Sequence, residues 1–197
     1  MARRRNRTPV QVIEEEWRAI LEFPNFSVSN LGRIYNNETE TFLSGSPNNY
    51  GHLRVAFPTE EFEAQYDSDG RFLKMRRVRA TRSLAVLVAQ AFVEAPSVIC
   101  DHVILLDGNL SNVVAHNLAW RPSRFAWLYT HQLKELDSQP FYFKNLEVTN
   151  LQRNIAYESI VEAGMMEGLL FEDIWTSTYA GTRVFPYGHV FEVTEQV

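Results

Sequence analysis

One apolar run, from Ser83 to Val93, most constrains the fold of this 197-residue chain. The run is rich in Leu, Ala and Val and ends before Pro96, so it predicts a buried helix with Ser83 or Thr81 as its N-cap. Because 45% of the residues are apolar, the chain has enough of them to bury such a helix in a core. The run is about half of the ~20 residues that cross a bilayer, so we expect no membrane partner.

The segments on both sides of this helix have the pattern of short antiparallel strands. Residues 53–57 alternate as a half-buried strand does, and residues 71–82 predict a second strand. Residues 98–120 predict strands and loops, and residues 123–136 a helix. Turn residues separate these elements at 36–37, 44–49, 67–70 and 107–109. The sequence therefore predicts an α+β fold that begins with a small antiparallel sheet module.

The C-terminal third, after a linker at residues 138–140, has a different character. Residues 159–164 and 169–175 predict two short helices around a glycine turn, the layout of a helix-turn-helix, and residues 190–193 a strand. Residues 133–197 contain ten acidic residues and four Lys or Arg. Since this excess would repel phosphates, it favours a protein partner or a structural role for the segment. We expect its aromatic residues to pack its core: Trp175, Tyr179, Phe185 and Tyr187.

Two basic clusters lie in the first half of the chain. One has six cations and no acid within twelve residues, a density that attracts the phosphates of nucleic acid: Arg71, Lys74, Arg76, Arg77, Arg79 and Arg82. Alternatively, these residues lie on a solvated strand and pair with Glu60, Glu61 and Glu63. The other cluster contains four arginines in residues 1–13, which predict a flexible basic tail or a nucleic-acid contact.

The single cysteine and the N-terminal sequence indicate an intracellular setting. Cys100 cannot form an internal disulfide, and one thiolate cannot supply a four-cysteine zinc site. The N-terminal arginines are followed by Glu14, Glu15 and Glu16 and not by an apolar stretch, so we expect no secretory signal. The expected location is the cytoplasm of a host cell.

The adjacent residues Asp101 and His102 are the candidate hydrolytic pair. Phosphodiester hydrolysis needs a base that deprotonates water and a hard divalent cation held by oxygen ligands, and this pair supplies one group for each task. By itself the pair is a weak signal, because a loop histidine bonded to its neighbouring carboxylate is the commoner meaning of such a pair. If both residues lay in a strand, their side chains would point to opposite faces, and a twist or bulge would be needed to bring them together.

The residues after the pair have a distinctive spacing. Asn109, Asn112, Asn117, Leu118 and Trp120 follow Gly108 at positions +1, +4, +9, +10 and +12. With Asp101-His102, this series resembles the HNH homing endonucleases of phages and introns. The segment from Glu15 to Tyr35 is similar to the NUMOD4-like module that commonly precedes this nuclease. Residues 87–92 resemble the helix between the two, and residues 159–174 and 187–191 the closing helix-turn-helix repeat.

The resemblance implies a basic tail over residues 1–13, a NUMOD4-like antiparallel β module over 14–82, a ββα-metal HNH core over 83–137 and an acidic helix-turn-helix-like domain over 138–197. It implies that His102 is the general base and that Asp101 is a ligand for Mg²⁺ or another divalent cation. Asn117 counts among the catalytic residues as the amide that ties the loop to the hairpin. The implied partner is double-stranded DNA, held along the basic cluster mainly through its phosphates.

Three departures from the family pattern leave catalysis open. The helix position that usually supplies a metal ligand is Ala126, and His131 lies on another face of the predicted helix. The polar pair usually found before the Leu-Val-Ala segment is replaced by apolar residues at 84–86, and residues 103–106 form a longer, apolar turn. The alternative is a catalytically inactive descendant that serves as a nucleic-acid-binding or assembly protein of a phage or ribonucleoprotein complex. A third possibility is a transcription factor built on the C-terminal unit.

Overall fold

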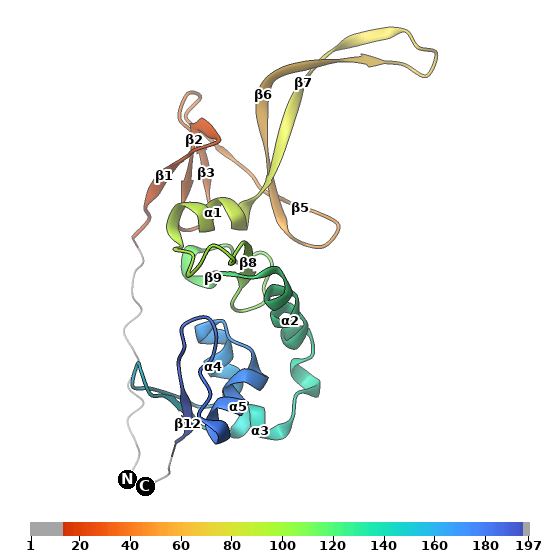
Figure 1. The fold of residues 1–197 in the computed structure, drawn as a ribbon. Coiled ribbons are helices and arrows are strands. Elements are labelled where there is room, and N and C mark those ends of the chain that lie inside the picture. The colour runs from red at the N-terminus through yellow and green to blue at the C-terminus, as the bar shows by residue number, and fades with distance from the viewer. Residues whose placement is uncertain (1–13, 195–197) are drawn as a thin grey trace, which may run out of the picture.

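The computed structural model describes residues 14–194, which form four antiparallel sheets and five α-helices (Figure 1). Along the chain, the sheets have four, three, two and three strands; in the first three sheets the strands lie in chain order, and in the last the first strand lies in the middle. The predicted α+β class is confirmed. None of the helices within the described residues is long and apolar enough to cross a membrane.

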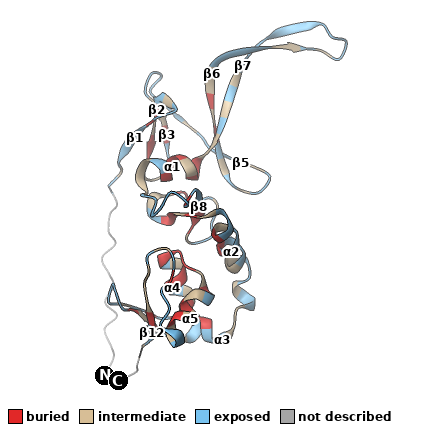
Figure 2. Cartoon of the chain, in the orientation of Figure 1, coloured by how far each residue is buried: buried red, intermediate tan, exposed pale blue. Residues whose placement is uncertain are grey.

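The first half of the chain forms two sheets. The strands of the first are β1 (Trp17–Ile20), β2 (Phe23–Ser29), β3 (Ile34–Asn36) and β4 (Thr41–Leu43). Those of the second are β5 (Ser46–Pro47), β6 (Leu53–Tyr66) and β7 (Phe72–Ser83). The distal part of the β6–β7 hairpin, residues 58–80, extends away from the rest of the protein, and we call it the arm (Figure 1). Most residues along it are exposed (Figure 2).

The arm is longer than the sequence predicts, because β6 continues past Pro58 to Tyr66. Proline cannot donate to a strand ladder, and this part of the chain also contains several glutamates, so it has no strand signature. The pairing register shifts between Pro58 and Phe62, and this irregularity accommodates the proline within the hairpin.

The predicted helix over residues 83–93 is confirmed as α1 (Leu84–Phe92). Ser83 occupies the N-cap position, but its side chain makes no capping hydrogen bond, and Thr81 lies within β7. Five α1 residues are buried, and they pack in one core with apolar side chains of the first two sheets, such as Val28 and Phe57. Many of the buried residues drawn in red around α1 in Figure 2 belong to this core.

A central hairpin follows, made of β8 (His102–Leu105), the short 3-10 helix η1 (Ala115–Asn117) and β9 (Leu118–Arg121). Leu105 and Leu118 pair across it and belong to the core around α1. Ile104 and Ala119 also pair, and they pack against the next helix, α2 (Ser123–Lys134). Both faces of the hairpin are therefore buried. The expectation that residues 103–106 form a longer turn is wrong, since most of them lie in β8.

The C-terminal unit, residues 138–194, follows the 3-10 helix η2 (Leu136–Ser138). It contains α3 (Phe141–Asn145), β10 (Val148–Asn150), β11 (Ile155–Tyr157), α4 (Ile160–Glu167), α5 (Phe171–Ala180) and β12 (Phe191–Val193). The helix pair and β12 agree with the sequence prediction, whereas β10 and β11 were not predicted. Ser159 caps α4 by accepting a hydrogen bond from the Glu162 amide, and Gly168 ends it with φ +64°.

The expectation that four aromatic residues pack the core of this unit is wrong for three of them. Tyr179, Tyr187 and Phe185 are 68%, 49% and 39% exposed, and only Trp175 packs partly against the core. The core is filled instead by residues such as Phe143 and Phe171. Phe185 and Tyr187 lie in the loop after α5, where they contact Phe125 and Arg121 outside this core.

Candidate functional site

Asp101 and His102 form a hydrogen-bonded pair at the start of the central hairpin. The distance from His102 Nδ1 to Asp101 Oδ1 is 2.8 Å, and the two side chains are 55% and 65% exposed. Because Asp101 precedes β8, strand alternation does not separate the two groups, and no bulge is needed to bring them together. The pair is therefore accessible to a large substrate such as a nucleic acid.

The charge of Asp101 determines which nitrogen of His102 carries the proton. The hydrogen bond from His102 lowers the pKa of the Asp101 carboxyl and outweighs the opposing effect of desolvation. The backbone amides of Asp101 and Ser123 lower this pKa further. An ionised carboxylate only accepts hydrogen bonds, so Nδ1 of neutral His102 is the donor. Nε2 then has a free lone pair directed away from Asp101.

The loop between β8 and η1 is held together by Asp107, Asn112 and Asn117. The Asn117 amide donates to Asp107 Oδ1 at 2.8 Å and to the carbonyl of Asn112 at 2.7 Å, and its side-chain oxygen accepts from the Asp107 amide at 3.1 Å. Asn112 donates to Asp107 Oδ2 at 2.6 Å. Burial raises the pKa of Asp107, but these hydrogen bonds and that from the Asn109 amide outweigh it and lower the pKa. Asn117 thus joins both ends of the loop.

The side chains near the pair offer few metal ligands. Within residues 14–194, no three His, Cys, Asp or Glu side chains are grouped so that they could hold a metal ion. Ala126 packs partly buried against the core formed by Ile104 and Phe125, and His131 faces Glu135 with Nδ1 3.4 Å from the carboxylate. Zinc sites require three or four protein ligands, which the pair lacks. Mg²⁺ keeps several waters and binds one or two carboxylates together with substrate phosphates, so Asp101 suits this ion.

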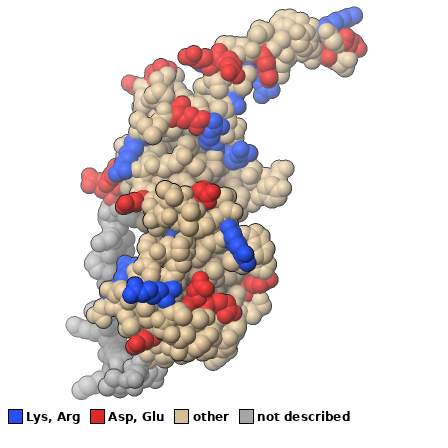
Figure 3. Space-filling view, in the orientation of Figure 1, with Lys and Arg blue, Asp and Glu red and all other residues tan. Residues whose placement is uncertain are grey.

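Five of the six predicted phosphate-binding residues lie on the arm or at its tip: Arg71, Lys74, Arg76, Arg77 and Arg79. All five are exposed, and both cationic and anionic side chains are visible at the base and at the tip of the arm in Figure 3. Arg76 lies opposite Glu63 on the ladder, yet no ion pair within residues 14–194 joins a β7 cation to Glu60, Glu61 or Glu63. The residues thus lie on a solvated strand, as the alternative expects, but without ion pairs to these glutamates, and phosphate binding stays a prediction.

Arg82 differs from the other five. Its guanidinium forms an ion pair with Glu22 and lies over the ring of Phe23, with its central carbon 5.7 Å from the ring centre. This pairing raises the pKa of Arg82 and lowers that of Glu22. Arg82 thus joins β7 to the first sheet, and part of its charge is compensated.

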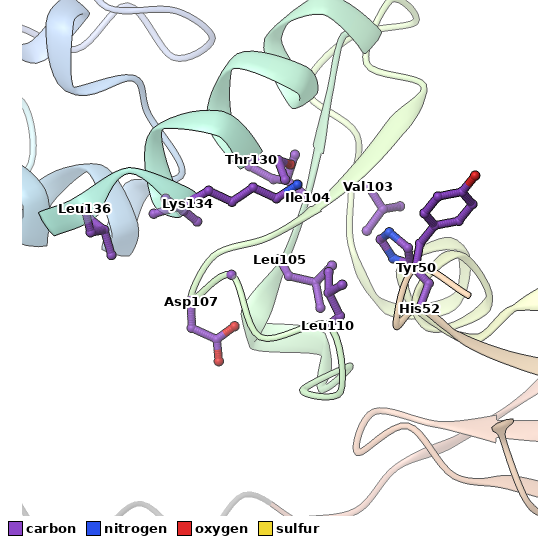
Figure 4. Close-up of a pocket in the computed structure, with 12 residues that line it drawn as sticks. Tyr50, His52, Val103, Ile104, Leu105, Asp107, Leu110, Thr130, Lys134 and Leu136 are labelled. Carbon is purple, nitrogen blue, oxygen red and sulfur yellow. The ribbon is translucent and has the colours of Figure 1, made fainter. Parts of the chain in front are cut away.

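A pocket of about 400 Å³ lies beside the central hairpin (Figure 4). Tyr50 and His52 line it from the loop before β6, Leu105 from β8, and Thr130 and Lys134 from α2. Neither Asp101 nor His102 contributes to this lining, so the pocket is separate from the candidate site. The sequence did not predict this pocket, because its largely aliphatic lining comes from segments that are distant in the chain.

A comparison with known protein families identifies a motif in the first part of the chain. Residues 15–57 match the NUMOD4 motif. A solved structure described as "DNA binding and cleavage by the HNH homing endonuclease I-HmuI" is 19% identical, with a TM-score of 0.42, over 92% of this chain and 99% of that chain. No curated protein matches the chain. The segment that contains β1 to β4 therefore carries the NUMOD4 motif, which supports the predicted resemblance to HNH homing endonucleases.

Proposed function

We propose that the protein binds double-stranded DNA and hydrolyses its phosphodiester bonds with a divalent cation, as an HNH-type endonuclease. The observation that carries this proposal is the hydrogen bond from His102 Nδ1 to Asp101, at the exposed start of the central hairpin. The bond leaves Nε2 free to accept a proton and leaves the second carboxylate oxygen of Asp101 available for a cation. The match of residues 15–57 to the NUMOD4 motif supports the same family.

In this proposal, His102 is the general base. Its Nε2 accepts a proton from the attacking water, and the positive charge that develops on the ring is stabilised by the Asp101 carboxylate at 2.8 Å. The carboxylate also fixes the orientation of the ring, so that the base is in place before the substrate binds. Asn117 has an indirect role: it holds the loop that connects the two strands.

The Asp101 carboxylate would hold Mg²⁺ or another divalent cation together with phosphate oxygens of the DNA. When bound, the cation neutralises charge on the phosphate and on the leaving oxygen. An aspartate is ionised at neutral pH, as a cation ligand must be, and the hydrogen bond from His102 lowers the pKa of Asp101 further.

The arm would hold the DNA through its backbone. The cations at its tip and along β7, such as Lys74 and Arg76, are exposed and not paired with the glutamates of β6. Contacts of this kind set the position of a duplex and contribute affinity that falls with salt, but they do not read sequence.

A second candidate function is that of a DNA-binding protein that has lost catalysis. The specific observation is Ala126, whose methyl group packs against the hairpin core at the position where the family usually has a metal ligand. The lack of a three-donor cluster within residues 14–194 favours the same alternative. Such a protein would be a nucleic-acid-binding or assembly component of a phage or ribonucleoprotein complex.

For the C-terminal unit we propose a protein contact and not DNA reading. The first turn of α5 has the acidic residues Glu172 and Asp173, which would repel phosphates. Phe141 and Tyr179 are 80% and 68% exposed on this unit and could contribute apolar area to a protein interface. The proposed setting remains intracellular.

The proposal is tested by incubating supercoiled plasmid with the protein and Mg²⁺ or Mn²⁺. Relaxed circles or linear product with the wild type, but not with His102→Ala or Asp101→Asn, are expected. Supercoiled plasmid that stays intact under all metal conditions, while the protein still binds it in a salt-dependent manner, would support the second candidate function.

A further inference from the structure

Arg121, at the end of β9, is completely buried and bonded to backbone only. Its Nη1 donates to the carbonyl of Trp120 at 2.8 Å, its Nη2 to that of Glu167 at 2.9 Å and its Nε to that of Gly168 at 3.0 Å. The guanidinium also lies over the rings of Phe125 and Tyr187. Each of the three nitrogens of the guanidinium thus donates to one backbone carbonyl.

Two of the three carbonyls belong to the end of α4, whose last residue is Glu167. The final carbonyls of a helix have no partner within the helix and carry partial negative charge, so a guanidinium is a favourable cap for them. Its flat fork reaches two acceptors at once, which a lysine ammonium on a flexible stem does not reproduce. Arg121 therefore ties the end of β9 to the C-terminal unit.

The end of β9 also supports the candidate hydrolytic pair. His102 lies directly opposite Arg121 on the β8–β9 ladder. Two residues later, the backbone amide of Ser123 is close enough to the Asp101 carboxylate to lower its pKa. The segment 121–123 is thus joined to His102 through the ladder, and the sequence neighbour of His102 is the other member of the pair, Asp101.

Helix α2 is fixed to the same unit by two further side chains. Gln132 donates to the carbonyl of Leu169 at 3.0 Å and accepts from the amide of Phe171 at 3.0 Å, at the start of α5. The Tyr129 hydroxyl donates to the carbonyl of Leu106 at 2.8 Å and lies 3.5 Å from that of Gly164. The hairpin and α2 are therefore both held by the backbone of the C-terminal unit.

We infer that Arg121 is a positioning residue, through which the C-terminal unit fixes the segment that orients Asp101 and His102. The inference rests on the proposed function and adds a role for the C-terminal unit within it. On this inference the C-terminal unit supports the candidate hydrolytic site, because the C-terminal end of α4 fixes the position of the end of β9.

The first test replaces Arg121 with lysine, which keeps the positive charge but not the planar guanidinium that donates to two carbonyls at once. We expect kcat for plasmid nicking to fall on the order of 10²-fold while KM stays near the wild-type value, since small misplacements of reacting groups have effects of this size. The ¹⁵N shifts of the His102 ring, measured at one neutral pH, should change from a predominant Nδ1–H form to a mixture of tautomers.

A second variant keeps the inference testable if Arg121→Lys does not fold. A Cβ at Gly168 would lie 2.9 Å from Arg121 Nη2 and 2.8 Å from Leu106 Cδ2, so Gly168→Ala displaces the guanidinium from the opposite side. Gly181→Ala is the matched control: its φ of +62° is close to the +64° of Gly168, but a Cβ there would meet no atom within 4 Å. Both variants carry the same backbone penalty, and only Gly168→Ala should change the His102 tautomer and kcat.

The outcomes separate this inference from the proposed function. A wild-type protein that does not cut DNA overturns the proposed function, yet the tautomer measurement still tests the positioning role. A folded Arg121→Lys or Gly168→Ala protein with wild-type ring shifts and kcat overturns the inference and leaves the proposed function standing. Equal changes in Gly168→Ala and Gly181→Ala also overturn it, because a general loss of stability would then explain the effect.

Discussion

The side chain of Asn117 makes two hydrogen bonds with Asp107: it donates to the carboxylate at 2.8 Å and accepts from the backbone amide at 3.1 Å. A third hydrogen bond reaches the carbonyl of Asn112. These contacts close the loop of the central hairpin with a single amide, which can donate and accept at the same time. They identify Asn117 as the residue on which the geometry of this loop most depends.

We therefore expect Asn117→Ala to destabilise the protein more than most polar substitutions. It leaves the Asp107 amide and the Asn112 carbonyl without partners, and each such partly buried group costs about 1–3 kcal/mol. Urea unfolding measures the change in the free energy of unfolding. Asn109→Ala, in the same loop, is the control and should cost less, because the exposed Asn109 side chain makes one hydrogen bond within residues 14–194, which it accepts from the Ser111 amide. Equal losses would show that the Asn117 network does not hold the loop.

The lowered pKa of Asp107 predicts how stability responds to acid. Since the folded-state pKa lies below the unfolded value of about 3.9, Asp107 contributes its full stability above that value. The contribution is lost as pH falls through the lower folded pKa. The free energy of unfolding should therefore decrease between about pH 5 and pH 2, and Asp107→Asn should decrease less steeply over the same range. Parallel pH curves for the two proteins would contradict this assignment.

Gly32 should be sensitive to substitution because it contacts the central hairpin loop. A Cβ at this residue would lie 2.5 Å from Val113 Cγ2, and its φ of +79° is unfavourable for alanine. Gly70, in the turn of the arm, has the same φ but no neighbour within 4 Å. Gly70→Ala should thus cost about 1–2 kcal/mol, and Gly32→Ala about 1–3 kcal/mol more. Thermal unfolding of both variants measures the difference, and similar values would indicate that the contact with Val113 is easily relieved.

DNA binding by the arm predicts a defined salt dependence. If Arg76 and Lys74 each contact one phosphate, replacing either with glutamine should reduce the slope of log K against log salt by about 0.9. Arg82→Gln should reduce it less, because the Arg82 guanidinium is held by Glu22. Fluorescence anisotropy with a duplex at several salt concentrations provides the slopes. An unchanged slope for Arg76→Gln and Lys74→Gln would show that the arm does not contact the phosphates.

Sequence patterns were sufficient where local signals decide the structure. The apolar run before Pro96 predicted a buried helix over residues 83–93, and α1 has nearly these bounds. The turn residues at 107–109 likewise predicted the turn after β8, where Gly108 has a φ of +71°. The helix pair around Gly168 was predictable because Ser159 and the glycine are ordinary start and stop signals.

The missed features depend on contacts that are distant in the chain. The arm extends past Pro58 only because β7 supplies a pairing strand, which local composition does not reveal. Two of the three acceptors of Arg121 lie 46 and 47 positions later in the chain, and they are backbone carbonyls, which any residue type provides. Tyr179 and Tyr187 were expected in the core because aromatic residues are often buried, but Tyr179 is largely exposed, and Tyr187 lies half-exposed over the Arg121 guanidinium.

The most direct test of the central claim is single-turnover cleavage of duplex DNA with saturating Mg²⁺, measured together with DNA affinity. His102→Ala should bind DNA as the wild type does and lose cleavage. His116→Ala, which changes an exposed histidine on η1 of the same hairpin, should keep both. Cleavage by His102→Ala at the wild-type rate, or no cleavage by the wild type with Mg²⁺ or Mn²⁺, would contradict the assignment of Asp101 and His102 as the hydrolytic pair.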